Sequence, residues 1–119
     1  MGNQIHPSAV VESGCTLGDD VRIGPFCHVG PDVVLGNGVE LLAQISVQGI
    51  TTIGDNTRIF PFASIGNEPQ DLKFHGERVT LDVGSNCIIR EGVTMNPGTK
   101  GGTSSTKVGN NCAFLANSH

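Results

Sequence analysis

The side chains of this sequence that could transfer protons near neutral pH are its four histidines. Imidazole is the group best suited to general-base catalysis there, because its pKa lies close to that pH. His75 lies in a polar stretch, whereas His28 and His119 each occupy the sixth position of a repeating hexad, which we place at a corner. Spacing pairs none of the histidines with a second catalytic group, and we expect His6 and His28 to be solvated surface residues.

A second group of polar side chains is compact enough to bind a sugar or a phosphate. Gln70, Asp71 and Lys73 follow closely on one another, although a solvated loop explains the same residues, and spacing alone favours the loop. Further basic residues that could add positive charge for an anionic ligand are Arg78, Arg90 and Lys100. The sequence has no Walker-type phosphate loop, no dinucleotide-binding fingerprint and no GxSxG nucleophile motif.

The four cysteines are interpreted as core residues rather than ligands or disulfide partners. Cys15, Cys27, Cys87 and Cys112 all occupy the same small, inward position of a hexad, and no CxxC occurs. Cys87 and Cys112 fall on one face of adjacent coils if the chain between them bulges out. We expect free thiols, no bound metal and no cofactor.

The element that must position these groups is set by a period of six. Eleven branched aliphatic residues recur at this spacing: Ile5, Val11, Leu17, Ile23, Val29, Leu35, Leu41, Val47, Ile53, Ile59 and Ile65. A hexapeptide repeat predicts an all-β fold, a parallel β-helix with three faces per coil. Residues 18 apart should then stack, with coils about 4.8 Å apart. Gly often follows the aliphatic residue, where a tight corner favours a residue without Cβ.

The repeat is interrupted twice, and both interruptions are predicted to be loops projecting from corners. The first runs from Asn67 to about Leu81, and the second from Gly101 to Thr106. The register resumes at Val83 after the first and at Val108 after the second. Loops that interrupt a strict repeat are the places where function is most often found.

Composition adds limits on the class of protein. A length of 119 residues predicts a single domain, 1–119, and the net charge of −4 argues against a general nucleic-acid surface. No signal peptide and no long apolar stretch is seen, so we expect a cytoplasmic protein without a transmembrane segment. The hexads stop in mid-coil at His119, without a cap. We therefore expect the front part of a longer protein; the alternative is that the exposed end packs against a partner.

Four stretches of the sequence resemble one family of acyltransferases. They are IHPSAVVE, VRIGPFCHVGP, IFPFASIGNEPQDLKFHGE, and IREGVTMNPGT followed by VGNNCAFLANSH. The family is the acyl-carrier-protein:UDP-N-acetylglucosamine O-acyltransferases of lipid A biosynthesis, and the resemblance covers essentially the whole sequence. It implies a left-handed β-helix, a homotrimer, and active sites in clefts between neighbouring subunits.

The resemblance also implies a reaction and its residues. A 3-hydroxyacyl chain moves from acyl carrier protein to the 3-hydroxyl of UDP-N-acetylglucosamine, with a histidine base and no metal. Gln70, Asp71, Leu72 and Lys73 match the loop that touches the substrates, and His119 matches a histidine lining the active site. The family motif continues as H-x-x-H-D, and its second histidine is the base. That base is expected just past His119, so no catalytic residue lies in this sequence, which is expected to be inactive alone.

The same resemblance places further coils and a C-terminal helical domain beyond His119. Two other functions remain open. A γ-class carbonic anhydrase shares the solenoid but needs three zinc-binding histidines, and this sequence has no closely spaced histidine pair. A non-catalytic β-helix scaffold would require the gene to end near residue 119. Fold alone does not decide between these functions.

Overall fold

The computed structural model describes residues 2–66, 79–95 and 104–115, and these residues form sixteen parallel strands and no helix. The strands lie in three sheets, which we call faces A, B and C. Face A contains β1 (Gln4–Ile5), β4 (Arg22–Ile23), β7 (Glu40–Leu41), β10 (Arg58–Ile59), β13 (Ile88–Ile89) and β16 (Ala113–Phe114). Face B contains β2 (Val10–Val11), β5 (His28–Val29), β8 (Ser46–Val47), β11 (Ser64–Ile65) and β14 (Thr94–Met95). Face C contains β3 (Thr16–Leu17), β6 (Val34–Leu35), β9 (Ile50–Ile53), β12 (Val79–Val83) and β15 (Ser104–Val108).

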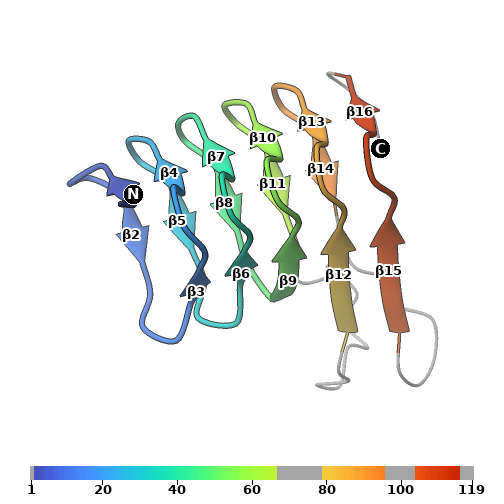
Figure 1. Ribbon diagram of the computed structural model, residues 1–119, viewed down its shortest axis with the longest axis horizontal. Coiled ribbons are helices and arrows are strands. Elements are labelled where there is room, and N and C mark those ends of the chain that lie inside the picture. The colour runs from blue at the N-terminus through green and yellow to red at the C-terminus, as the bar shows by residue number, and fades with distance from the viewer. Residues whose placement is uncertain (1, 67–78, 96–103, 116–119) are drawn as a thin grey trace.

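Each strand pairs with the third strand before it and the third after it, which makes a parallel β-helix (Figure 1). Residues 18 apart are neighbours in the early coils, as the pairing of Ile5 with Ile23 and of Ile23 with Leu41 shows. After the first interruption the partners are 30 apart, yet Ile59 still pairs with Ile89. The interruption therefore leaves the stack of coils intact, and the predicted left-handed β-helix is confirmed.

The core is a narrow column filled by the predicted aliphatic residues. Val29, Val47 and Ile65 are fully buried on face B, one above the other. The small position of each hexad also points inward, since Val21 and Cys27 are buried as well. Ile5 is in register but is 43% exposed, because it belongs to the end coil, which has a neighbour on one side only.

The corners are tight for two separate reasons. A Cβ at Gly24 would collide with the backbone carbonyl oxygen of Leu42 in the next coil, so this position needs glycine for space rather than for its dihedral angles. The left-handed backbone conformation occurs two residues later, at Phe26 with φ 58°. The prediction that the corners favour glycine is thus confirmed at Gly24, where the reason is the lack of space for a Cβ atom.

Two sequence predictions are wrong in their placement. The sixth position of a hexad lies in a strand and not at a corner, because it directly precedes the inward aliphatic residue, as His28 in β5 shows. The predicted loops also end too late in the sequence, because β12 begins at Val79 and β15 at Ser104. These two strands pair over five successive residues, from Val79 with Ser104 to Val83 with Val108. The remaining residues of both predicted loops lie outside the described ranges.

Candidate functional site

The predicted substrate-binding residues fall in two parts of the chain that the structure does not describe. Gln70, Asp71, Leu72 and Lys73 lie between β11 and β12, within residues 67–78, and His119 lies within residues 116–119. Their roles therefore stay predictions. The described strands on either side do show where these segments are attached to the solenoid.

Both internal segments are attached at the corner between faces B and C, on neighbouring coils. The first begins after β11 and the second after β14, and these strands pair through Ile65 and Met95. They return in β12 and β15, which also pair with each other (Figure 1). The fold thus brings the residues that flank 67–78, Gly66 and Val79, beside those that flank 96–103, Met95 and Ser104. The sequence already indicated this arrangement, because each interruption of the repeat comes after an inward residue of face B, Ile65 in one case and Met95 in the other.

The attachment point is tightly packed. Gly66 has φ 74°, and a Cβ there would collide with the Thr51 hydroxyl and with the backbone oxygen of Gln48. Thr51 is 1% exposed and donates its Oγ1 hydrogen to Gln48 O at 2.7 Å. The N–H of Gly66 donates to Met95 O at 2.7 Å. The first segment therefore starts from a backbone position with little freedom to move.

The two described histidines lie in the first coils of the solenoid, away from this corner. His28 Nε2 contacts Glu12 Oε2 at 2.7 Å, and both side chains are about half exposed. His6 Nδ1 lies 2.8 Å from Ser8 Oγ. A carboxylate can orient an imidazole for proton transfer. The sequence analysis did not predict the contact between Glu12 and His28. The two residues are 16 apart, which is close to the 18 residues of one coil, and this spacing could have indicated that they lie on neighbouring coils.

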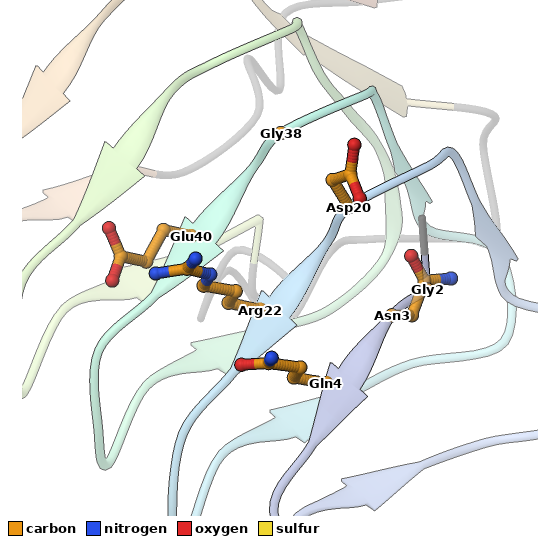
Figure 2. A pocket seen from close by; sticks show the side chains of 7 residues that line it. All are labelled: Gly2, Asn3, Gln4, Asp20, Arg22, Gly38 and Glu40. Atoms are coloured by element: carbon orange, nitrogen blue, oxygen red, sulfur yellow. The ribbon is translucent and has the colours of Figure 1, made fainter.

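A hollow of about 610 Å³ lies on the outer side of the first three coils (Figure 2). Its charged residues are Asp20, Arg22 and Glu40, and Gly2, Asn3, Gln4 and Gly38 complete the lining. These groups can hold a polar molecule. The hollow also contains none of the predicted site residues. We therefore do not assign the chemistry to it.

The cysteines are placed as predicted. All four are free, with Cys27 and Cys87 buried and Cys15 and Cys112 partly buried in the outer coils. Cys87 and Cys112 lie on adjacent coils, because the residues that follow them, Ile88 and Ala113, are paired. Burial raises the pKa of the Cys15 and Cys27 thiols, which disfavours the nucleophilic thiolate. Within the described ranges, no three His, Cys, Asp or Glu side chains are grouped to hold a metal.

Arg90, which was predicted to add positive charge for an anionic ligand, lies at a different corner. It follows β13 and precedes β14, between faces A and B. Its guanidinium carbon lies 4.1 Å from the centroid of the Phe60 ring, and its Nε donates to Glu91 Oε1 at 3.1 Å. The structure therefore does not bring Arg90 to the attachment point of residues 67–78. Among the described residues, no helix is long and apolar enough to cross a membrane.

The sequence and the fold were both compared with known proteins. The family model described as bacterial transferase hexapeptide (six repeats) matches residues 14–44. The acyl-[acyl-carrier-protein]–UDP-N-acetylglucosamine O-acyltransferase of Mesorhizobium japonicum is 54% identical over 115 residues, which are 97% of this chain and 41% of that protein. The enzyme of the same name from Rhizobium johnstonii is 60% identical over 116 residues, 98% of this chain and 43% of its own length.

Solved structures agree with the sequence comparison. LpxA from Acinetobacter baumannii superposes with a TM-score of 0.90 and 40% identity, over 95% of this chain and 44% of that one. LpxA from Bacteroides fragilis, a UDP-N-acetylglucosamine acyltransferase, gives a TM-score of 0.87 and 39% identity, with the same coverage of 95% and 44%. The chain thus spans less than half the length of these relatives. In sequence and in fold, the chain matches the N-terminal part of the hexapeptide-repeat UDP-N-acetylglucosamine O-acyltransferases.

Proposed function

We propose that this chain is the N-terminal part of an acyltransferase that moves a 3-hydroxyacyl chain from acyl carrier protein to the 3-hydroxyl of UDP-N-acetylglucosamine, the first step of lipid A biosynthesis. One observation carries the proposal. The chain is 54% and 60% identical, over nearly its whole length, to relatives whose names state this acyl donor and this acceptor. Identity of this extent on the same solenoid argues against a carbonic anhydrase that shares only the fold.

The chemistry is an acyl transfer without a covalent enzyme intermediate. A histidine base takes the proton of the sugar 3-hydroxyl while its oxygen attacks the thioester carbonyl. Collapse of the tetrahedral intermediate breaks the carbon–sulfur bond, and the carrier thiol leaves with a proton. In our proposal this base lies just past His119, and Gln70, Asp71, Leu72, Lys73 and His119 contact the substrates.

The strands that flank these residues support a common site. The segment with residues 70–73 starts and ends at the B–C corner, beside the coil that carries Thr94 on face B. The next coil lies 25 residues further along the sequence, as the bond between Ser85 and Asn110 shows. Counted along the sequence, one such step from Thr94 is position 119, so His119 has the same place in the repeat as Thr94.

We further propose that the protein assembles as a homotrimer, as the resemblance implies, and that it works in the cytoplasm. The cysteines support the second point, because Cys87 and Cys112 lie on adjacent coils and are not joined in a disulfide. A reducing compartment keeps such pairs as thiols. Further coils and a helical domain beyond His119 complete the proposed protein.

The test begins with the gene. The reading frame should continue past codon 119 with a histidine three residues later and then an aspartate; a stop codon at 120 would leave a non-catalytic solenoid instead. The protein read from the continued frame should transfer a labelled 3-hydroxyacyl chain to UDP-N-acetylglucosamine, whereas the 119-residue chain should not. Lys73→Ala should raise the KM for the nucleotide sugar by roughly tenfold or more, through loss of a charge-assisted contact. Lys107→Ala, an exposed lysine on face C, is the matched control.

A further inference from the structure

Two threonines differ from the rest of the core because each carries a buried hydroxyl group. Among the described residues, the buried polar side chains are Thr51, which is 1% exposed, and Thr57, which is 0% exposed. In the coils before and after, the position of Thr51 is taken by apolar side chains, Val33 and Leu81. Core packing therefore requires no hydroxyl at position 51, and a buried hydroxyl is costly unless it is hydrogen-bonded.

The Thr51 hydroxyl lies at the point where residues 67–78 leave the solenoid. Its Oγ1 donates to Gln48 O at 2.7 Å. Both oxygen atoms occupy the space that a Cβ atom at Gly66 would need, and Gly66 directly precedes this segment. The Cα of Gly66 therefore packs against the hydrogen-bonded pair, and the hydroxyl of Thr51 helps to set where the segment begins.

Two further contacts hold Gly66 in place. Its N–H donates to Met95 O at 2.7 Å, on the neighbouring coil. A Cβ atom at Gly49 would lie 2.5 Å from Gly66 O, so this oxygen packs closely against Gly49. Gly49 and Gly66 have φ of 70° and 74°, a left-handed conformation that glycine adopts readily. The position of Gly66 thus depends on Thr51, Gly49 and Met95 together.

We propose that Thr51 is a positioning residue for the substrate site. It fixes the backbone of Gly66, and with it the starting point of the chain that carries residues 70–73. The inference rests on the proposed function, in which residues 70–73 contact the substrates. Positioning matters for such contacts, because a misplacement of about 1 Å can cost roughly 100-fold in rate.

Valine at position 51 would break this arrangement with little change in size. It replaces the hydroxyl by a methyl group, which cannot donate a hydrogen bond to Gln48 O. A carbon atom also keeps about 3.3 Å or more from a carbonyl oxygen. The methyl group and Gln48 O would therefore move apart, and Gly66, which packs against both, would shift. Serine keeps the hydroxyl and should leave Gly66 in place.

Thr57 provides a matched control for this substitution. It lies beyond the other end of β9, between faces C and A, and its Oγ1 donates to Gly84 O at 2.8 Å. Thr57→Val removes an equally buried hydroxyl by the same chemical change, but away from the corner that holds Gly66. A general loss of stability would act alike in both variants, whereas a positioning role belongs to Thr51 alone.

The first experiment measures acyl transfer by the protein read from the continued frame. Thr51→Val should raise the KM for the nucleotide sugar roughly tenfold, because the contacting residues are displaced. Thr51→Ser and Thr57→Val should leave this KM unchanged, and urea unfolding records the stability of each variant. A parental KM in Thr51→Val, or an equal rise in Thr57→Val, overturns the proposal.

A double variant tests whether Thr51 acts through the segment that carries Lys73. If it does, Thr51→Val should matter less in a protein that already lacks the Lys73 side chain. The KM of the double variant Thr51→Val, Lys73→Ala should then fall short of the product of the two single effects. Full multiplication of the two effects would show that Thr51 acts by another route and would refute the positioning role.

Gly49 offers a second way to displace Gly66, which decides the question if Thr51→Val does not fold. The added Cβ of Gly49→Ala would meet Gly66 O. Gly38→Ala, with the same φ of 70°, would instead meet the Asn56 side chain between faces C and A. Gly49→Ala should raise the KM for the nucleotide sugar, and Gly38→Ala should not. Equal KM values in the two variants would contradict the proposal.

The two proposals fail in different ways. Acyl transfer with a parental KM in both Thr51→Val and Gly49→Ala would refute this inference and leave the proposed function intact. A protein that transfers no acyl chain would refute the proposed function, and amide hydrogen exchange then tests the anchor by itself. The Gly66 N–H should exchange faster in Thr51→Val than in Thr57→Val. Equal exchange in these two variants would show that Thr51 does not hold Gly66.

Discussion

Val47 offers the sharpest test of the inward ladder of aliphatic residues. It is fully buried on face B, between Val29 and Ile65 in the neighbouring coils. No described side chain opposite it carries a charge, because the core consists of aliphatic residues, cysteines, Ala and Met with two buried threonines. An aspartate at position 47 would therefore place an unpaired carboxylate, or a protonated acid without partners, inside the column.

The magnitude can be estimated from two substitutions. Val47→Ala removes two carbon atoms, at about 0.8 kcal/mol each, and leaves a cavity, which together cost roughly 2–3 kcal/mol. Val47→Asp adds the burial of an unpaired polar or charged group, which costs several kcal/mol more. A domain of this size is stable by only about 5–15 kcal/mol, so Val47→Asp should unfold most or all of the solenoid.

The control is the neighbouring residue of the same strand. Ser46→Asp puts the same carboxylate on the outer side of β8 and should change stability by roughly 0.5 kcal/mol or less. Urea unfolding followed by circular dichroism compares the parent with all three variants. The expected order of stability is parent and Ser46→Asp together, then Val47→Ala, then Val47→Asp. A Val47→Asp protein with the unfolding midpoint of the parent would refute the inward ladder.

Three further predictions concern a corner, a buried hydroxyl and a thiol. Gly24→Ala should destabilise the fold measurably in urea, because its Cβ would meet the Leu42 carbonyl; Gly109→Ala, whose Cβ finds its nearest neighbour at 3.9 Å, should not. Thr57→Val should cost about 1–3 kcal/mol in the same assay, because the Thr57 Oγ1 donates to a backbone oxygen at 2.8 Å and accepts from a backbone N–H at 3.2 Å. Equal stability of Thr57→Val and the parent would show these bonds to be unimportant. Burial raises the pKa of Cys27, so the unfolded chain loses its thiol proton first and stability should fall as pH rises above the ordinary thiol pKa. Cys27→Ala should flatten that fall in unfolding free energies measured across alkaline pH; an unchanged slope would contradict it.

The pattern of residues was sufficient for most of the fold. A branched aliphatic at every sixth position can be buried on one side only if each hexad forms one face, so the stacking of Ile23 on Leu41 followed directly. The inward position of Cys27 followed from the same count. The resemblance of residues 70–73 and His119 to an acyltransferase site is also a property of the sequence, and their roles stay predictions.

Other features depend on contacts between coils and could not be predicted from the period. The hexad count assigned His28 to a corner, but the hydrogen bonds to neighbouring coils put it inside β5. The strands β12 and β15 begin before the repeat resumes at Val83 and Val108. They do so because the two strands pair with each other from Val79 and Ser104 onward, although the residues before Val83 and Val108 do not follow the hexad pattern.

The sequence by itself thus determined the solenoid, its core and its likeness to one family, because burial of a periodic apolar pattern leaves few alternatives. Only the tertiary structure showed that two segments start from one corner and that Phe26 and Phe62 occupy left-handed turns with exposed rings. Backbone dihedral angles and exposure are set by the coils above and below each residue, and the identity of a residue does not contain that information.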